Sequence, residues 1–156
     1  MNKLDSIDKK ILTLLQQRGR ITNAELSKRV GLSAASALER VKKLERGGII
    51  KGYHARLDPA AVGIGLVILV EVTLARHQHD AILRFVEAVQ TVEEIVDCYH
   101  VTGRADYLLR VVAKDIPSYE LFVMETLSTL PGVQHIETMM ILSAVKESKG
   151  LPIMVE

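Results

Sequence analysis

The sequence predicts an α+β protein of 156 residues, with an N-terminal winged helix-turn-helix followed by a C-terminal ferredoxin-like βαββαβ domain. Residues 1–60 show three amphipathic helix patterns separated by short turns, whereas residues 61–156 show strand and helix patterns in the order βαβ twice. The Asp58-Pro59 step disfavours helix and marks the boundary between the two patterns. We therefore expect domains at 1–58, including a linker strand, and at 59–156.

Apolar spacing predicts the first helix from Ser6 to shortly before Gly19. Its apolar residues recur at i, i+4, i+7 and i+8, which places them on one helical face: Ile7, Ile11, Leu14 and Leu15. This face predicts packing against other helices.

Residues typical of helix starts and helix ends predict two further helices. Thr22–Glu25 has the pattern of a capping box and opens a helix that ends near Val30. Gly31 permits a tight turn, and Ser33 is placed to cap a third helix that ends at Gly47-Gly48. Two helices joined by so short a turn, with another packed behind them, are typical of a helix-turn-helix.

The third helix has one apolar side and one cationic side. The side expected in the core holds Ala34, Ala37, Leu38, Val41 and Leu44. The opposite side holds Ala35, Ser36, Glu39, Arg40, Lys42, Lys43 and Arg46. Residues 1–60 carry 13 Lys/Arg against 6 Asp/Glu, a net charge of +7, while the rest of the chain has a net charge of −6. This asymmetry favours a polyanionic partner such as DNA, the alternative being a solvated basic surface.

The stretch from Ile49 to Leu57 alternates as a strand would and is interrupted by Gly52. It predicts a small wing or hairpin that leads into the linker.

The second half of the chain repeats one pattern. Strands are expected at Ile64–Leu74, Val92–Val101, Tyr107–Ala113 and Val133–Val145, and helices at Ile82–Val89 and Tyr119–Leu130. The first strand lacks clear alternation, which predicts burial of both its faces. Helices on one side of such a sheet leave the other to be covered, and a second copy of the domain is the simplest candidate.

Motifs for catalysis are absent from the sequence. It has no nucleophile elbow, P-loop or dinucleotide fingerprint, so we expect no enzyme and no cofactor of the catalytic kind. The single cysteine, Cys98, is expected to be a packed thiol, and the pair His77 and His79 lacks nearby metal-ligand partners, so no metal is expected. Without a signal peptide or a long apolar run, the expected location is the cytoplasm, with no membrane partner.

The connection between the second and third expected strands is polar. Gly103 permits a turn, and Arg104 and Asp106 offer opposite charges that could hold the two ends of a free amino acid. An ordinary polar hairpin is the alternative interpretation.

Several motifs in the same order resemble the leucine-responsive regulatory protein and asparagine regulator (Lrp/AsnC) family. These motifs cover nearly the whole chain: Leu4-Asp5-x-x-Asp8-x-x-Ile11-Leu12, Gly19-Arg20-Ile21, Glu25–Ser33, Leu38-Glu39-Arg40-Val41-x-x-Leu44-Glu45, Gly48-Ile49-Ile50-x-Gly52-Tyr53, Thr102-Gly103-x-x-Asp106-Tyr107 and Leu130-Pro131-Gly132-Val133. The resemblance implies a transcriptional regulator of amino-acid or nutrient metabolism that binds double-stranded DNA. It also implies homodimers that assemble further, commonly as octamers, bind an amino acid between dimers and associate with the nucleoid.

The resemblance places the helix-turn-helix at Asn23–Lys42 and the effector contacts on the polar connection. The predicted DNA-binding residues are Thr22, Asn23, Ser33, Ala35, Ser36, Glu39, Arg40, Lys42, Lys43 and Arg46. The predicted effector-binding residues are Thr102, Gly103, Arg104, Ala105, Asp106 and Tyr107, with Met139, Met140 and Ile141 as a second wall.

Two segments depart from the family pattern. Ala34-Ala35-Ser36 stands where many relatives have a Pro-Thr-Pro-like opening of the third helix, so a hydroxyl contact to a base is lost at Ala35. Arg104-Ala105 replaces the acidic or aromatic residues that are frequent in the effector loop. The apolar wall at 139–141 favours leucine or methionine as effector.

Two other functions remain open from the sequence. An architectural DNA-packing protein without an effector response would share the basic N-terminal half. An enzyme or an enzyme's regulatory subunit could use the ferredoxin-like half to bind a metabolite, but it has no need of a capped, basic helix-turn-helix.

Overall fold

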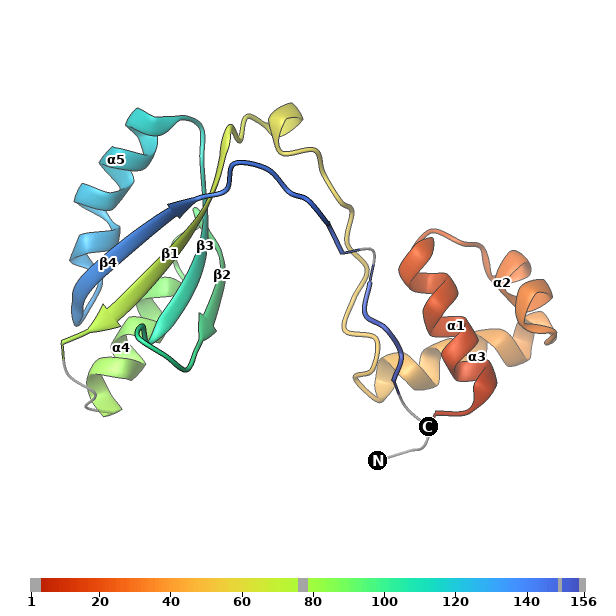
Figure 1. Cartoon of the computed structure of the whole chain (residues 1–156). Helices are drawn as coiled ribbons and strands as arrows, with labels where there is room; N and C mark the ends of the chain where they lie inside the picture. Colours follow the sequence, from red (N-terminus) through yellow and green to blue (C-terminus); the bar gives the residue numbers. More distant parts are fainter. Residues whose placement is uncertain (1–3, 76–78, 149, 155–156) are drawn as a thin grey trace. The chain divides into compact units, whose positions relative to one another are not determined.

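The computed structural model describes residues 4–75, 79–148 and 150–154 and divides the chain into two compact units (Figure 1). The first unit comprises residues 1–56 together with 145–156, and the second comprises 57–144. The chain thus leaves the first unit after Arg56 and returns to it at Val145. The sequence placed this C-terminal segment in the second domain instead.

The helices of the first unit are α1 (Ser6–Gln17), α2 (Asn23–Val30) and α3 (Ala34–Arg46). They agree with the three predicted helix patterns. Their buried apolar side chains form one small core: Ile11, Leu26, Val30, Ala37 and Leu44. Leu38, expected in this core, is 41% exposed, so the apolar side of α3 is only partly covered.

A complete capping box opens α1 rather than α2. The Asp5 carboxylate accepts hydrogen bonds from the backbone N–H groups of Ile7 and Asp8, and the Asp8 carboxylate accepts one from the Asp5 N–H at 3.3 Å. At α2, only the first half of the expected box forms, because the Glu25 carboxylate pairs with two arginines, Arg18 and Arg29.

The turn between α2 and α3 forms as the sequence predicts. Gly31 adopts a left-handed conformation with φ 74°, which a residue with a side chain adopts at a cost. Ser33 then caps α3, its hydroxyl accepting a hydrogen bond from the Ser36 N–H.

The expected wing does not form as strands. Residues 51–58 have no regular secondary structure, although the N–H groups of Ile49 and Ile50 both donate to the Leu44 carbonyl. Tyr53 is then held by a hydrogen bond from its hydroxyl to Glu45. An alternating sequence forms a ladder only where a second strand is available, and here the partners of this segment come from α3.

The second unit is a four-stranded antiparallel sheet with two helices. Its strands are β1 (Leu66–Leu74), β2 (Ile95–His100), β3 (Tyr107–Ala113) and β4 (Val133–Met140), in the spatial order β2-β3-β1-β4. The helices are α4 (His79–Val89) and α5 (Ile116–Glu125), and short 3-10 turns lie at Ala60–Val62 and Leu127–Thr129. This order of elements is the ferredoxin-like arrangement that the sequence predicts.

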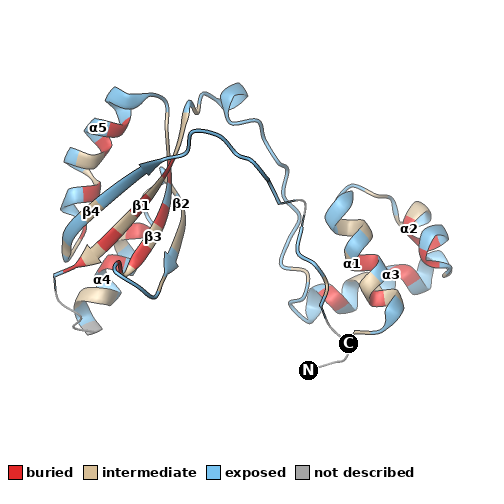
Figure 2. Ribbon diagram, in the orientation of Figure 1, coloured by how far each residue is buried: buried red, intermediate tan, exposed pale blue. Residues whose placement is uncertain are grey.

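Among the described residues, helices cover one face of the sheet. Side chains on that face of β1 and β3 are buried together with the α4 and α5 aromatics: Ile68, Val70, Val72, Leu109, Val111, Phe85 and Phe122 (Figure 2). On the opposite, open face, Val67, Leu69, Leu108 and Val112 are half-buried. The prediction that β1 is buried on both faces is therefore wrong for the single chain.

Two predicted boundaries also differ. Helix α5 begins earlier than expected because Asp115 caps it, and it gives way to the 3-10 turn after Glu125. The last strand ends at Met140 rather than at Val145, and the chain continues as an extended segment.

Candidate functional site

The outer face of α3 presents polar and cationic side chains to solvent. Most of the predicted DNA-binding residues are exposed: Thr22, Ser33, Ala35, Ser36, Glu39, Lys42, Lys43 and Arg46. Glu39 lies 3.5 Å from Lys42 and 4.0 Å from Arg46, which partly neutralises these two cations. Lys43 makes no hydrogen bond or ion pair within the part of the chain that the structure describes. The arrangement offers several cations to phosphates from one helix.

Two of the predicted DNA contacts stabilise the turn itself. The Asn23 side-chain amide donates a hydrogen bond of 2.8 Å to the Ala34 carbonyl, joining the starts of α2 and α3. The Thr22 hydroxyl accepts a hydrogen bond of 3.2 Å from the Glu25 N–H. Both residues thus set the geometry between the two helices.

Arg40 is directed toward α1 rather than only toward solvent. Its Nη1 lies 2.5 Å from Asp5 Oδ2 and 2.8 Å from Asp8 Oδ1, and Asp8 is buried. These hydrogen bonds raise the pKa of the Arg40 guanidinium, which stays charged. A backbone hydrogen bond from Asp8, together with the Arg40 contact, lowers the pKa of Asp5. Arg40 therefore joins the cationic helix α3 to the start of α1.

The polar connection between β2 and β3 is fixed by Asp106. Its carboxylate accepts a hydrogen bond of 2.8 Å from the Leu74 N–H, and its backbone N–H donates to the Val72 carbonyl at 3.0 Å. Ala105 and Tyr107 on either side are buried. Asp106 thus secures the turn to the end of β1 in addition to any role toward a ligand.

The exposed part of the same connection is formed by Thr102, Gly103 and Arg104. Gly103 has φ 134°, a conformation that favours glycine. The Arg104 guanidinium lies 4.0 Å from Glu71 and 3.8 Å from Glu137. One cation therefore faces two carboxylates.

Glu71 and Glu137 are candidate site residues that the sequence motifs do not identify. They are paired across β1 and β4 in the sheet. A charged residue within the otherwise apolar β1 was the available signal, but the pairing of β1 with β4 could not be read from local sequence.

The second predicted effector wall lies at the other end of the sheet. Tyr107, which ends the polar connection, pairs with Val72, whereas Met140 pairs with Ile68. Their partners on β1, Ile68 and Val72, are four positions apart, which corresponds to about 13 Å along the strand. A single chain therefore does not bring residues 102–107 and 139–141 together.

The described residues include one histidine of the His77 and His79 pair. His77 lies outside the described residues, and His79 begins α4. Within the described ranges, no cluster of three or more His, Cys, Asp or Glu residues could hold a metal ion. Cys98 is a half-buried free thiol, and burial raises its pKa, which makes it a poor nucleophile.

Helices of the described chain are also too short or too polar to cross a membrane.

Each of the two units contains a region that matches a known protein family. Residues 4–51 match the winged helix-turn-helix DNA-binding family, and residues 67–151 match the Lrp/AsnC ligand binding domain. The chain belongs to the Lrp/AsnC family. It is thus a DNA-binding transcriptional regulator with an amino-acid-binding domain, as the sequence motifs indicated.

Individual members of the Lrp/AsnC family align along almost the entire chain. The leucine-responsive regulatory proteins of Escherichia coli K12 and Klebsiella pneumoniae are each 47% identical over 150 residues, which cover 96% of this chain and 92% of theirs. A Neisseria meningitidis transcriptional regulator, solved in complex with L-methionine, is 39% identical with a TM-score of 0.91, covering 96% of this chain and 97% of its own. An AsnC family regulator from Agrobacterium tumefaciens is 33% identical, with a TM-score of 0.89 and the same coverage.

Proposed function

We propose that this Lrp/AsnC regulator controls genes of amino-acid metabolism in response to leucine or methionine, as a cytoplasmic, nucleoid-associated protein. The observation that carries the proposal is the combination, in one chain, of a capped helix-turn-helix with a basic α3 face and an Lrp/AsnC ligand binding domain. The methionine complex of the Neisseria relative and the leucine-responsive relatives favour an apolar amino acid as effector.

For DNA binding, we propose that the start of α3 approaches the bases and that its later residues contact phosphates. The small residues Ser33, Ala35 and Ser36 at its start allow close approach to base edges in the major groove. The cations Lys42, Lys43 and Arg46, with Glu39 among them, face the phosphates. Thr22 and Asn23 position the turn, and Arg40 acts mainly by holding α3 against α1.

For effector binding, we propose that residues 102–107 hold the charged ends of the amino acid. Arg104 is 84% exposed and can pair with a carboxylate, while the acidic side chains near it can pair with an ammonium group: Glu71, Glu137 and Asp106. Residues Met139, Met140 and Ile141 would contact the apolar side chain from another copy, because they are remote within one chain.

The open sheet face supports assembly of the chain with itself. Its central side chains, Leu69 and Leu108, are half-buried with no helix over them. A second sheet would bury these side chains through a symmetric contact. We propose a dimer through this face, and an octamer of four such dimers that places amino-acid sites between dimers.

The effector proposal is tested by isothermal titration with leucine, methionine, aspartate and asparagine. We expect Arg104→Ala to lose leucine or methionine binding at least about tenfold, since a charge-assisted contact is removed. Arg84→Ala, an exposed arginine on α4 outside the connection, is the matched control and should bind normally. Binding of only charged or amide amino acids would contradict the proposed effector class.

Asp106→Asn separates ligand binding from the structural role of this residue. The amide oxygen can still accept the hydrogen bond from the Leu74 N–H, so the variant should keep the fold. We expect weaker amino-acid binding with little change in DNA binding by the free protein. An unchanged amino-acid response would remove Asp106 from the site.

A further inference from the structure

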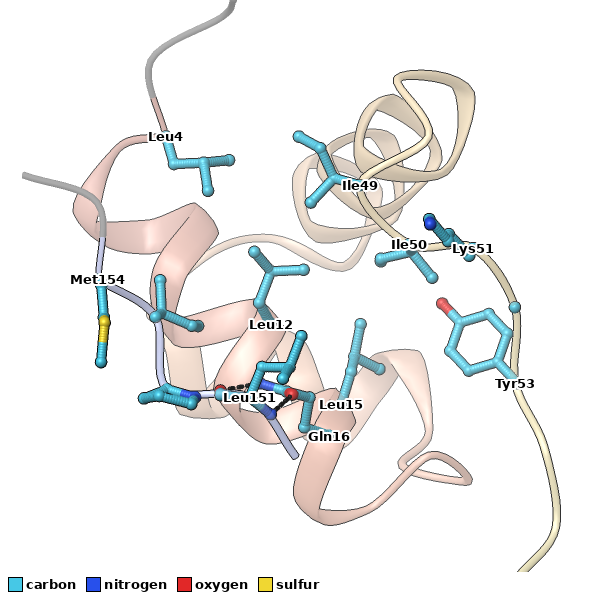
Figure 3. A pocket seen from close by; sticks show the side chains of 13 residues that line it. Leu4, Leu12, Leu15, Gln16, Ile49, Ile50, Lys51, Tyr53, Leu151 and Met154 are labelled. Carbon is cyan, nitrogen blue, oxygen red and sulfur yellow. Dashed lines mark hydrogen bonds between the residues drawn. The ribbon is translucent and has the colours of Figure 1, made fainter. Parts of the chain in front are cut away.

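The C-terminal segment of the first unit is bound to α1 through the side chain of Gln16. Gln16 Nε2 donates to the Leu151 carbonyl at 3.1 Å, and Gln16 Oε1 accepts from the Leu151 N–H at 2.5 Å (Figure 3). One side-chain amide thus satisfies both backbone groups of an extended residue, as a neighbouring strand would.

The residue before Leu151 must be small and must adopt an unusual backbone conformation. Gly150 has φ 136°, and a Cβ at this position would lie 2.6 Å from Gln16 Oε1. The Ser148 hydroxyl also contacts Gly150, accepting from its N–H at 3.2 Å and donating to its carbonyl at 3.1 Å. Glycine is therefore the residue that lets the segment approach α1 closely.

An apolar groove lies beside these hydrogen bonds. It encloses about 370 Å³, with walls from α1 and the segment after α3 on one side and from the C-terminal segment on the other. Leu12, Leu15 and Ile50 are apolar side chains of one wall (Figure 3). Ile153 belongs to the opposite wall. Ile153 is half-buried, whereas Leu151 is 79% exposed, so backbone hydrogen bonds contribute much of the contact.

We propose that residues 150–154 are a C-terminal anchor, a segment that docks on the α1 groove of its own chain. The chain returns to the first unit after completing the second, and Arg56 and Glu147 form an ion pair at the points of exit and return. The ligand-binding unit is thus joined to the DNA-binding unit at two points of the chain instead of one. Because Asp8 of α1 also binds Arg40 of α3, the anchor is attached to the helix that supports the DNA-binding face.

Chemical cross-linking tests whether the anchor lies against α1. Leu12 and Ile153 are on opposite walls of the groove, and replacing them leaves Gln16 and Gly150 intact. The full chain would carry Cys98→Ala with Leu12→Cys and Ile153→Cys, and the control would carry Thr13→Cys, an exposed neighbour on α1, in place of Leu12→Cys. With a short bismaleimide reagent, we expect a cross-link within one chain that forms about tenfold faster than in the control, because docking raises the effective thiol concentration.

Two results of this cross-linking would overturn the proposal. Equal rates for the two cysteine pairs would show that residues 150–154 do not lie against α1 in solution. A product of doubled mass on a non-reducing gel would assign the groove to the C-terminal segment of a second copy.

A second measurement avoids introduced cysteines. In the full-length protein, we expect Gln16→Ala to speed tryptic cleavage after Lys146 severalfold, because release of the anchor opens the segment more often. Gln17→Ala, one residue along the same helix, should be cleaved at the wild-type rate. Identical cleavage of the two variants would contradict the anchor.

Discussion

Arg40 is a single side chain that joins the cationic helix α3 to the start of α1. It lies on the cationic helix α3, yet its guanidinium contacts Asp5 and the buried carboxylate of Asp8. Pattern analysis places Arg40 on the exposed side of α3 because a helical wheel does not include the neighbouring helix. The structure adds a role in positioning α3 to the role that the sequence predicts.

We expect Arg40→Ala to destabilise the DNA-binding unit by about 1–3 kcal/mol, because the buried Asp8 carboxylate loses its charged partner. Urea unfolding measures this change in the free energy of unfolding. The control Lys43→Ala removes an exposed cation from the same helix. It should change the free energy of unfolding by less than about 0.5 kcal/mol. It should also lower the salt dependence of DNA binding, because one phosphate contact is removed. Arg40→Ala with unchanged stability and weakened DNA binding would instead make Arg40 a direct contact.

Asp5 predicts an acid dependence of stability. Its pKa in the folded protein lies below the ordinary value of 3.8, first because it accepts a backbone hydrogen bond from Asp8 and then because it binds Arg40. The ionised carboxylate therefore contributes its full stability above pH 3.8, and this contribution is lost as the pH falls through the lowered pKa.

Asp5→Asn keeps a capping oxygen but removes the charge. We expect a lower urea midpoint than wild type at pH 7, with the difference disappearing at a pH well below 3.8. Glu93→Gln, which removes an exposed carboxylate from the other unit, serves as control. A difference that persists unchanged into acid would contradict a charge-based role for Asp5.

At the scale of elements, helix starts could be predicted and side-chain partners could not. Ser33 caps α3 as its sequence position indicates, because capping depends on residues three apart. The capping box predicted that the Glu25 carboxylate would bind the Thr22 backbone N–H. This prediction was wrong because Arg18, in the preceding turn, binds the carboxylate instead. Residues 51–58 form no strand for a similar reason, since the alternation from Ile49 onward does not specify a pairing partner.

The cap of α3 gives a prediction with two independent measurements. Ser33→Ala should lower stability by about 1 kcal/mol, since the Ser36 N–H loses its acceptor. Ser33→Asp should retain the cap and near wild-type stability, but weaken DNA binding because it places a negative charge beside the phosphates. Unchanged DNA affinity in Ser33→Asp would place the start of α3 away from DNA.

At the scale of the whole molecule, the topology of the second unit followed from the order of its elements. What the sequence could not give was the position of residues that meet through the sheet, such as Glu71 and Glu137, or the return of residues 150–154 to α1. These contacts join segments far apart in the chain, and no local periodicity encodes them.

The open sheet face predicts the oligomeric state. We expect Leu108→Lys to shift sedimentation velocity profiles toward monomer, because a charge in the centre of this face opposes burial against a second sheet. Leu121→Lys alters an exposed leucine on α5, behind the other face, and should leave the dimer intact. Equal assembly of the two variants would mean that dimers form elsewhere.

The proposed function is tested most directly by a mobility-shift titration of the full-length protein on its own promoter region at fixed salt, with and without leucine or methionine. We expect a sequence-specific shift whose midpoint changes when one of these amino acids is added, because a ligand that binds one DNA-binding state better than another must alter DNA affinity. A salt-sensitive shift without sequence preference, unchanged by either amino acid, would contradict an effector-responsive regulator and favour an architectural DNA-packing protein.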